Sequence, residues 1–150
     1  MSKQWGTPTW YFFHTLAEHV DADFYKHNRT KFRQYITMIC NCLPCPECSE
    51  HAKQYIKYNM IESKIMEKED FKMFLLNFHN NVNMRKNQPQ FTNINQYRSF
   101  KLIDKYNDFK RIYLRNSGLN RSFCDSLQRR NIIKTLEEFL KSNLTYFRWS

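Results

Sequence analysis

Two cysteines three positions apart carry the most direct chemical signal in the sequence. Cys45 and Cys48 lie in the stretch Leu43–His51, and Pro44 and Pro46 flank the first of them. Two sulfurs at this spacing can form a disulfide within one turn or bind one metal ion. A cysteine just inside a helix N-terminus feels the positive end of the helix dipole, which favours the reactive thiolate. The stretch therefore predicts either thiol–disulfide chemistry or zinc binding.

Three further residues extend the possible metal site, namely Cys40, Cys42 and His51. Structural zinc usually needs two ligand pairs a dozen or more residues apart, whereas these candidates all lie between positions 40 and 51. A mononuclear zinc site is therefore possible but strained. Cys124 stands alone, and we expect a buried inert thiol because free cysteine behaves as a small apolar residue.

The composition favours an all-α domain. The 150 residues include only two glycines and four prolines, too few turn residues for a β-sandwich. A chain of this length makes one domain with a usable core. Thirteen Phe, nine Tyr and three Trp can fill that core, and some can stack on a planar cofactor.

Apolar periodicity predicts six helices. They are expected from Thr7 to about Val20, from about Thr30 to Leu43, from Pro46 to Asn59, from about Glu69 through Val82, from about Asn93 to Arg115, and from about Ser122 to Leu140. Residues 21–29 and Asn116–Gly118 are expected to be connections. The aromatic tail Leu144–Trp149 could dock on the body of the protein.

A polar cluster interrupts the apolar pattern of the fourth predicted helix. His79, Asn80 and Asn83 lie there although asparagine competes with helical hydrogen bonds. These side chains could simply cap the helix or face solvent. Alternatively, the protein needs polar groups at this place in the helix. No strand precedes Cys45, so the chain cannot build the sheet of a thioredoxin, and the dithiol needs another electron acceptor. Because aromatics surround this cluster, a flavin is a reasonable hypothesis.

The net charge of +10 bounds the possible partners. Residues 101–150 hold eleven Lys and Arg against five Asp and Glu, which suits an acidic partner, nucleic acid or an anionic membrane. The bases are spread among acids and apolar residues, so nucleic acid is not expected as the main partner. The alternative function is a helical binding module with a basic C-terminal arm for nucleic acid or an acidic partner, its cysteines structural or zinc-binding.

The sequence predicts neither a membrane span nor a signal peptide. No window of eighteen apolar residues occurs, and the first residues lack the apolar core of a signal peptide. Four of the five cysteines cluster within residues 40–48, which in a reducing compartment indicates catalysis or metal binding. We therefore expect no membrane span and a cytoplasmic protein that is not secreted.

Three short motifs follow one another along the chain. They are Gly6-x-x-x-Trp10-x-x-x-His14, Pro44-Cys45-x-x-Cys48-x-x-His51 and His79-Asn80-x-Val82-Asn83. Together they resemble the Erv/ALR-type FAD-linked sulfhydryl oxidases, especially the short forms encoded by large DNA viruses. Each motif is modest alone, but three in this order make the resemblance specific over residues 5 to about 100.

The resemblance implies a four-helix bundle plus a short fifth helix that binds FAD. It implies an oxidase core over residues 1–100 and a basic helical extension over 101–150 that packs on it. The residues expected to bind FAD are Gly6, Trp10, His14, Cys48, His51, His79, Asn80, Val82, Asn83, Arg85, Lys86 and Phe100. Thr7 and Gln88 stand where the family often has basic residues, and Lys86 or Arg85 could replace them.

The resemblance also implies an activity and its partners. Cys45 exchanges with the substrate and Cys48 passes electrons to FAD, so that protein thiols become disulfides and dioxygen becomes hydrogen peroxide. Substrates are protein thiols or a small disulfide shuttle protein, the protein is a homodimer, and no metal is needed. The expected location is the host cytoplasm or the virion. The roles of Cys40 and Cys42 stay open.

Overall fold

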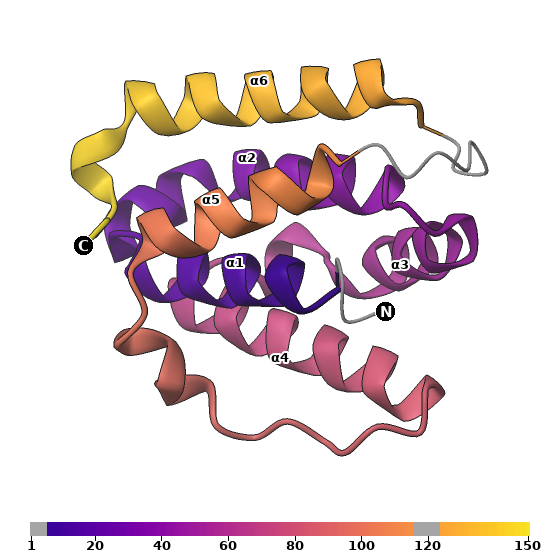
Figure 1. Ribbon diagram of the computed structural model, residues 1–150. Helices are drawn as coiled ribbons and strands as arrows, with labels where there is room; N and C mark the ends of the chain where they lie inside the picture. The colour runs from indigo at the N-terminus through magenta and orange to yellow at the C-terminus, as the bar shows by residue number, and fades with distance from the viewer. Residues whose placement is uncertain (1–5, 116–123) are drawn as a thin grey trace.

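Six α-helices carry the described part of the chain, residues 6–115 and 124–150 of the computed structural model (Figure 1). They are α1 (Gly6–His19), α2 (Ala22–Asn41), α3 (Pro46–Asn59), α4 (Lys68–Arg85), α5 (Leu102–Tyr113) and α6 (Ser126–Ser142). Three short 3₁₀ helices accompany them, namely η1 (Glu62–Lys64), η2 (Ile94–Arg98) and η3 (Leu144–Tyr146). The all-α class is confirmed, as are helices beyond residue 100.

Helix α1 lies between α5 and α4 (Figure 1), and its aromatic side chains contact both. Phe12 stacks on Phe109 of α5 with ring centroids 4.8 Å apart. Trp10 meets Phe78 of α4 edge to face at 5.0 Å. Such rings bury large apolar areas in favourable pair geometries. The division of the chain into a core and a separate extension over residues 101–150 stays a prediction, because α5 shares this aromatic core.

Helix α6 and the C-terminal tail cover α2. Phe139 of α6 lies 5.9 Å from Phe24 and 5.8 Å from Phe32, measured between ring centroids. Phe147 is buried and forms an isolated β-bridge with Val20. The predicted docking of the aromatic tail is therefore confirmed.

Helix α2 begins earlier than predicted. The Asp21 carboxylate accepts a hydrogen bond from the Phe24 N–H at 2.9 Å and caps the helix. Asn28 departs from helical geometry with φ of −124°, and its side chain donates to the Phe24 carbonyl. Residues 21–29 are thus the first part of α2, and their expected role as a connection is wrong. Only Phe24 and Tyr25 are buried in this part, too few to show helical periodicity.

The helix predicted over residues 93–115 is divided in two. Lys101 has extended geometry between η2 and α5, with φ −83° and ψ 125°. The Nε2 of His19 donates to the Phe100 carbonyl at 2.7 Å. In a continuous helix this carbonyl would instead accept from a backbone N–H of the same helix. A single continuous helix is therefore a wrong prediction.

Helix α6 begins at Ser126 with a capping box formed by Asp125 and Gln128. The predicted start at Ser122 and the predicted loop Asn116–Gly118 lie outside the described residues. In the two described ranges, no helix is long and apolar enough to cross a bilayer.

Candidate active site

The turn between α2 and α3 presents the two cysteines of the Cys-x-x-Cys motif. Cys45 is the N-cap of α3 and Pro46 opens the helix, which suits proline because the first helical N–H has no partner within the helix. The Cys45 Sγ accepts a hydrogen bond from the Cys48 N–H at 3.2 Å. Both cysteines are half-buried free thiols, so the pair stands as a dithiol.

The Cys48 thiol is harder to ionise than an ordinary cysteine. Burial raises the pKa of Cys48 to about 11, and the neighbouring Cys45 sulfur acts in the same direction. The charge of Lys86, just beyond α4, lowers this pKa. The expectation that the helix start holds Cys48 as a thiolate is therefore wrong for this dithiol. The cation that favours its thiolate comes from the end of α4.

A tryptophan and two histidines form a wall of rings between α1 and α4. Trp10 stacks on His79 with centroids 4.4 Å apart and planes 8° from parallel. His14 Nε2 and His79 Nδ1 share a hydrogen bond of 3.0 Å. Burial lowers the pKa of His14 to about 3 and that of His79 to about 4. Both rings are therefore neutral near pH 7, and one donates while the other accepts.

A hollow of about 260 Å³ opens against this ring wall. Its lining is Gly6, Thr7, Trp10, His79, Val82, Asn83, Lys86, Gln88 and Pro89. Six of these were predicted cofactor residues, and five of them come from two motifs far apart in the sequence, while the sixth, Lys86, follows the second of these motifs. An aromatic wall beside an amide and an ammonium group suits a planar polar ring that carries negative charge.

A left-handed turn after α4 shapes one side of the hollow. Asn87 has φ of 54°, a conformation that asparagine tolerates at a helix end. The Gln88 N–H donates to the Asn83 carbonyl at 2.8 Å. The Asn83 side chain donates to the Pro89 carbonyl at 3.2 Å. Gln88 thus lines the hollow with an uncharged amide, and Lys86 supplies the positive charge of the lining.

Two predicted cofactor residues act behind the hollow. Asn80 donates to the Phe91 carbonyl at 2.8 Å and accepts from the Phe91 N–H at 2.6 Å. It thereby fastens the segment that follows α4. His14 is bonded to His79 and fixes the ring that lines the hollow. Cys48 is half-buried and packs against the core.

Three other predicted cofactor residues lie away from the hollow. His51 faces Glu47 at 3.9 Å on the surface of α3. Arg85 is exposed at the end of α4. Phe100 packs on Tyr11, with ring centroids 5.7 Å apart. The structure does not bring these three side chains together with the others.

Two aromatic residues at this site were not among the predicted site residues. The Phe91 ring lies 5.5 Å from that of His79. Tyr97 stacks on His14 at 4.7 Å with planes 17° apart. Both lie after the third motif in a mostly polar stretch. An isolated aromatic residue in such a stretch was the signal that could have identified them as site residues. Tyr97 falls within the single helix that was predicted from about Asn93 to Arg115.

A second cysteine pair, which includes Cys42 just before the Cys-x-x-Cys motif, is oxidised. Cys42 is bonded to Cys124, which is 82 positions later, and the two Cα atoms are 5.2 Å apart. The prediction of a free inert thiol at Cys124 is wrong. This disulfide fastens the segment before α6 to the end of α2. Cys40 remains a buried free thiol, and burial raises its pKa.

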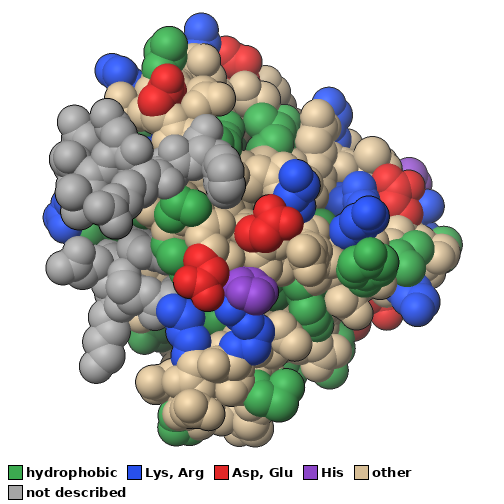
Figure 2. Space-filling view, turned by 90° about the vertical axis from the view of Figure 1, so that its right-hand side faces the viewer, with side chains coloured by type: hydrophobic (Ala, Val, Ile, Leu, Met, Phe, Trp, Pro, Cys, Tyr) green, Lys and Arg blue, Asp and Glu red, His purple; other side chains and the backbone are tan. Residues whose placement is uncertain are grey.

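The zinc site considered from the sequence is not assembled in the two described ranges. No group of three or more His, Cys, Asp and Glu side chains there could hold one ion, and Cys42 is already in a disulfide. Figure 2 shows the face where α3 lies, and on its described part acidic side chains lie among the basic ones. That mixture lacks the solid basic patch of a nucleic-acid site.

The sequence of this chain matches one family of known proteins. The family model described as Erv1 / Alr family matches residues 7–101. "Putative FAD-linked sulfhydryl oxidase 096R" of Invertebrate iridescent virus 3 is 36% identical over 92 residues, which are 59% of this chain and 60% of that protein. "FAD-linked sulfhydryl oxidase ERV1" of Oryza sativa subsp. japonica is 30% identical over 86 residues, 57% of this chain and 43% of that protein.

The match to a third relative covers a larger share of both proteins. The "FAD-linked sulfhydryl oxidase" of African swine fever virus (isolate Warthog/Namibia/Wart80/1980) is 31% identical over 110 residues, 73% of this chain and 79% of that protein. The chain spans less than two thirds of the length of the first two relatives. No solved structure matches the chain.

Proposed function

Because this chain belongs to the Erv1/Alr family, we propose that it is an FAD-dependent thiol oxidase. It forms disulfides in substrate proteins and reduces dioxygen to hydrogen peroxide. The Cys45–Cys48 pair is the redox centre, and the hollow beside Trp10 and His79 holds the flavin.

One observation carries the proposal. Tyr55 of α3, two turns after Cys48, stacks on Phe78 of α4 with ring centroids 4.9 Å apart, and Phe78 meets Trp10 of the ring wall edge to face at 5.0 Å. The dithiol and the ring wall are therefore neighbours, although their motifs lie apart in the sequence. A flavin in the hollow would be within reach of the inner cysteine.

The residues of the hollow fit FAD chemically. The ring wall offers a flat surface to an isoalloxazine, and its histidines are uncharged. Asn83 and His79 offer polar groups to the ring edge, and Lys86 can pair with a phosphate. Thr7 and Gln88 are uncharged, so among these three lining residues Lys86 is the one that can pair with a phosphate.

The cysteines divide the thiol chemistry between them. A substrate thiolate attacks the Cys45 Sγ of the oxidised pair, forms a mixed disulfide and displaces the Cys48 thiolate. A second substrate thiol then attacks the substrate sulfur of that mixed disulfide and releases Cys45. The substrate leaves with a disulfide, and the enzyme pair is left as the dithiol. Two electrons and two protons have moved from substrate to enzyme.

Bound FAD supplies the two-electron acceptor that reoxidises the pair and passes the electrons to dioxygen. Each turnover thus converts one dithiol and one dioxygen into one disulfide and one hydrogen peroxide. Lys86 favours the thiolate of Cys48 against the effect of burial. The neutral His14–His79 bond keeps the ring wall flat and in place.

The biological setting is part of the same proposal. The protein acts as a homodimer on protein thiols or on a small disulfide shuttle protein. It works in the cytoplasm of a host cell or in the virion. The similarity to viral relatives supports this setting, and sedimentation of the purified protein measures its oligomeric state.

An absorption spectrum of the purified protein tests the proposal. The expected result is a yellow protein with flavin bands and one FAD for each chain. Added dithiothreitol should be oxidised with uptake of dioxygen and release of hydrogen peroxide. A colourless protein that cannot be reconstituted with FAD contradicts the proposal.

A further inference from the structure

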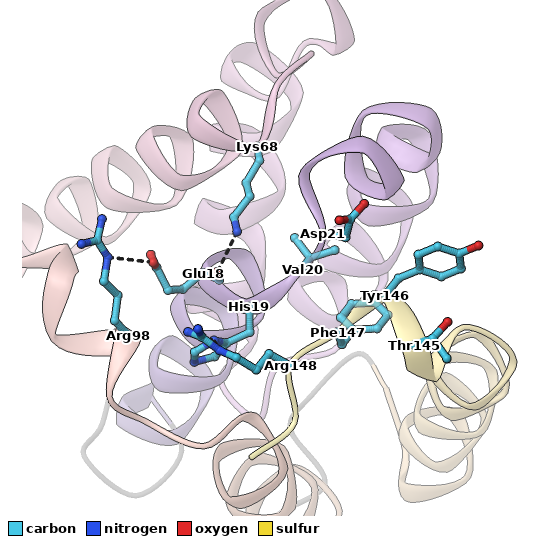
Figure 3. A pocket seen from close by; sticks show the side chains of 10 residues that line it. All are labelled: Glu18, His19, Val20, Asp21, Lys68, Arg98, Thr145, Tyr146, Phe147 and Arg148. Carbon is cyan, nitrogen blue, oxygen red and sulfur yellow. Dashed lines mark hydrogen bonds and ion pairs between the residues drawn. The ribbon is translucent and has the colours of Figure 1, made fainter.

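A second cavity lies at the other end of α1. Its volume is about 720 Å³, and its lining is Glu18, His19, Val20, Asp21, Lys68, Arg98, Thr145, Tyr146, Phe147 and Arg148. Figure 3 shows these side chains coming from α1, the start of α4, the region of η2 and the C-terminal tail. Along α1, Gly6 and His19 are about 20 Å apart at 1.5 Å per residue. The cavity is therefore separate from the hollow.

Both carboxylates of this cavity, Glu18 and Asp21, already have partners within the protein. Glu18 pairs with Lys72 at 2.8 Å and with Arg98 at 3.0 Å. The Asp21 carboxylate accepts the Phe24 N–H and caps α2. Neither acid is free to neutralise a further cation.

Two cations of the lining have no carboxylate partner in the described ranges. The Lys68 ammonium donates to the Glu18 carbonyl oxygen at 2.7 Å, which carries no full charge. The Arg148 guanidinium donates to His19 Nδ1 at 3.0 and 2.8 Å. Burial lowers the pKa of Lys68, the charges of Glu18 and Glu69 raise it, and the charges of Lys72 and Arg148 lower it. The positive groups of this cavity therefore repel one another.

His19 is held neutral while Arg148 is bound. Its Nε2 donates to the Phe100 carbonyl, so Nδ1 must be the acceptor for the guanidinium. Burial lowers the pKa of His19, and the Arg148 charge contributes to that direction. His19 thus positions Arg148 without neutralising it.

The tail that carries Arg148 is fastened to α1. The Arg148 N–H donates to the His19 carbonyl at 3.0 Å, and the Asp21 N–H donates to the Tyr146 carbonyl at 2.7 Å. Val20 and Phe147 form a β-bridge between these two bonds. Lys68 and Arg148 are consequently held on two fixed elements that share one cavity.

We propose that this cavity binds a phosphate group between Lys68 and Arg148, as free phosphate or as a phosphate monoester. A phosphate dianion relieves the repulsion between two cations and offers several acceptor oxygens to an ammonium and a guanidinium. Arg98 adds a third positive group at the rim while keeping its bond to Glu18. The proposal does not depend on the thiol oxidase activity.

The test uses the whole 150-residue chain as purified. Inorganic phosphate is titrated at constant ionic strength maintained with sodium chloride, and binding is followed by calorimetry and by the unfolding temperature. The expected result is saturable binding that stabilises the protein. Lys68→Gln and Arg148→Gln should each raise the Kd for phosphate at least about tenfold, as expected for loss of a charge-assisted hydrogen bond.

Lys134→Gln is the matched control, because Lys134 is an exposed base on α6 away from the cavity. It should leave phosphate binding unchanged. Since Arg148→Gln could loosen the tail, Lys68→Gln on α4 tests the site from a second element. Phosphate binding that is equal in both variants and the wild type, or an equal effect of chloride alone, overturns the proposal. A tighter Kd for O-phosphoserine than for inorganic phosphate assigns the site to phosphate monoesters, and the reverse assigns it to free phosphate.

Discussion

The two ends of α1 satisfy their polar side chains in opposite ways. On the side of the hollow, His14 and His79 are neutral and bind each other, and Lys86 lines the hollow. At the last turn of α1, Glu18 and Lys72 form an ion pair whose side chains are 9% and 8% exposed. In the described ranges Lys86 at the hollow has no carboxylate partner, whereas Glu18 at the last turn of α1 is buried and paired.

The difference separates function from stability. A neutral ring wall and an unpaired ammonium can receive an anionic planar ligand without breaking an existing ion pair. Glu18 and Lys72 already form a buried pair, so its loss leaves Lys72 with the more distant and exposed carboxylate of Glu69. Changes near the hollow should therefore alter activity, whereas changes at the last turn of α1 should alter the free energy of unfolding.

Cys48→Ser should have the largest effect. It removes the sulfur that passes electrons to the flavin in the proposed mechanism, so turnover with dithiothreitol should fall on the order of a thousandfold or more. Dioxygen uptake measures this, and the unfolding temperature should barely change. The matched control is Cys40→Ser at the buried free thiol, whose activity per folded molecule should be retained. Turnover that persists in Cys48→Ser would place the chemistry elsewhere.

Replacing both Cys42 and Cys124 by serine should have the opposite effect, namely lower stability with retained activity, although Cys42 lies only a few residues before Cys45 and Cys48. Loss of a cross-link over 82 positions should lower the free energy of unfolding by about 4 kcal/mol in the chain-entropy account. Denaturant unfolding measures this value. Activity per folded molecule should remain near that of the wild type. Loss of turnover without loss of stability would give this disulfide a redox role.

Glu18→Gln should destabilise the protein by about 3 kcal/mol, because it removes the close partner of buried Lys72 and leaves the exposed carboxylate of Glu69, 3.5 Å away. Burial opposes ionisation of Glu18, but Lys72 and Arg98 together hold its pKa below the ordinary carboxyl value. A lowered pKa stabilises the folded state above the ordinary value, and this contribution is lost as the pH falls through the lowered one. The difference between wild type and variant should be constant at neutral pH and shrink in acid. Equal stability at pH 7 contradicts the prediction.

Lys86→Gln should have the smallest effect. Lys86 is exposed, so folding should be unchanged, but loss of its charge should weaken FAD binding roughly tenfold. Fluorescence titration of the flavin-free protein with FAD measures this. Lys57→Gln, an exposed base near the end of α3, is the control. Equal FAD affinity of the two variants would remove Lys86 from the cofactor site.

Local signals predicted most of the helices. Pro46 marked the start of α3, which begins there, and the periodicity over 69–82 marked most of α4. The sequence failed where tertiary contacts decide. The break before α5 depends on a hydrogen bond from His19 to Phe100, which no local pattern contains.

The ring wall was predictable because its residues belong to recognisable motifs, and Trp10 and His79 do line the hollow. Phe91 and Tyr97 were missed because their contacts with His79 and His14 arise only when the segment after α4 folds back. The Cys42–Cys124 bond joins distant positions, and spacing alone cannot pair such cysteines.

Anaerobic reduction of the flavin is the most direct test of the central claim that Cys48 delivers electrons to a flavin in the hollow. Dithiothreitol is added to the yellow protein without dioxygen, and the flavin absorption is followed over time. The flavin bands of the wild type should bleach at the rate of turnover or faster, and those of Cys48→Ser should persist. Equal bleaching of both proteins would contradict the account.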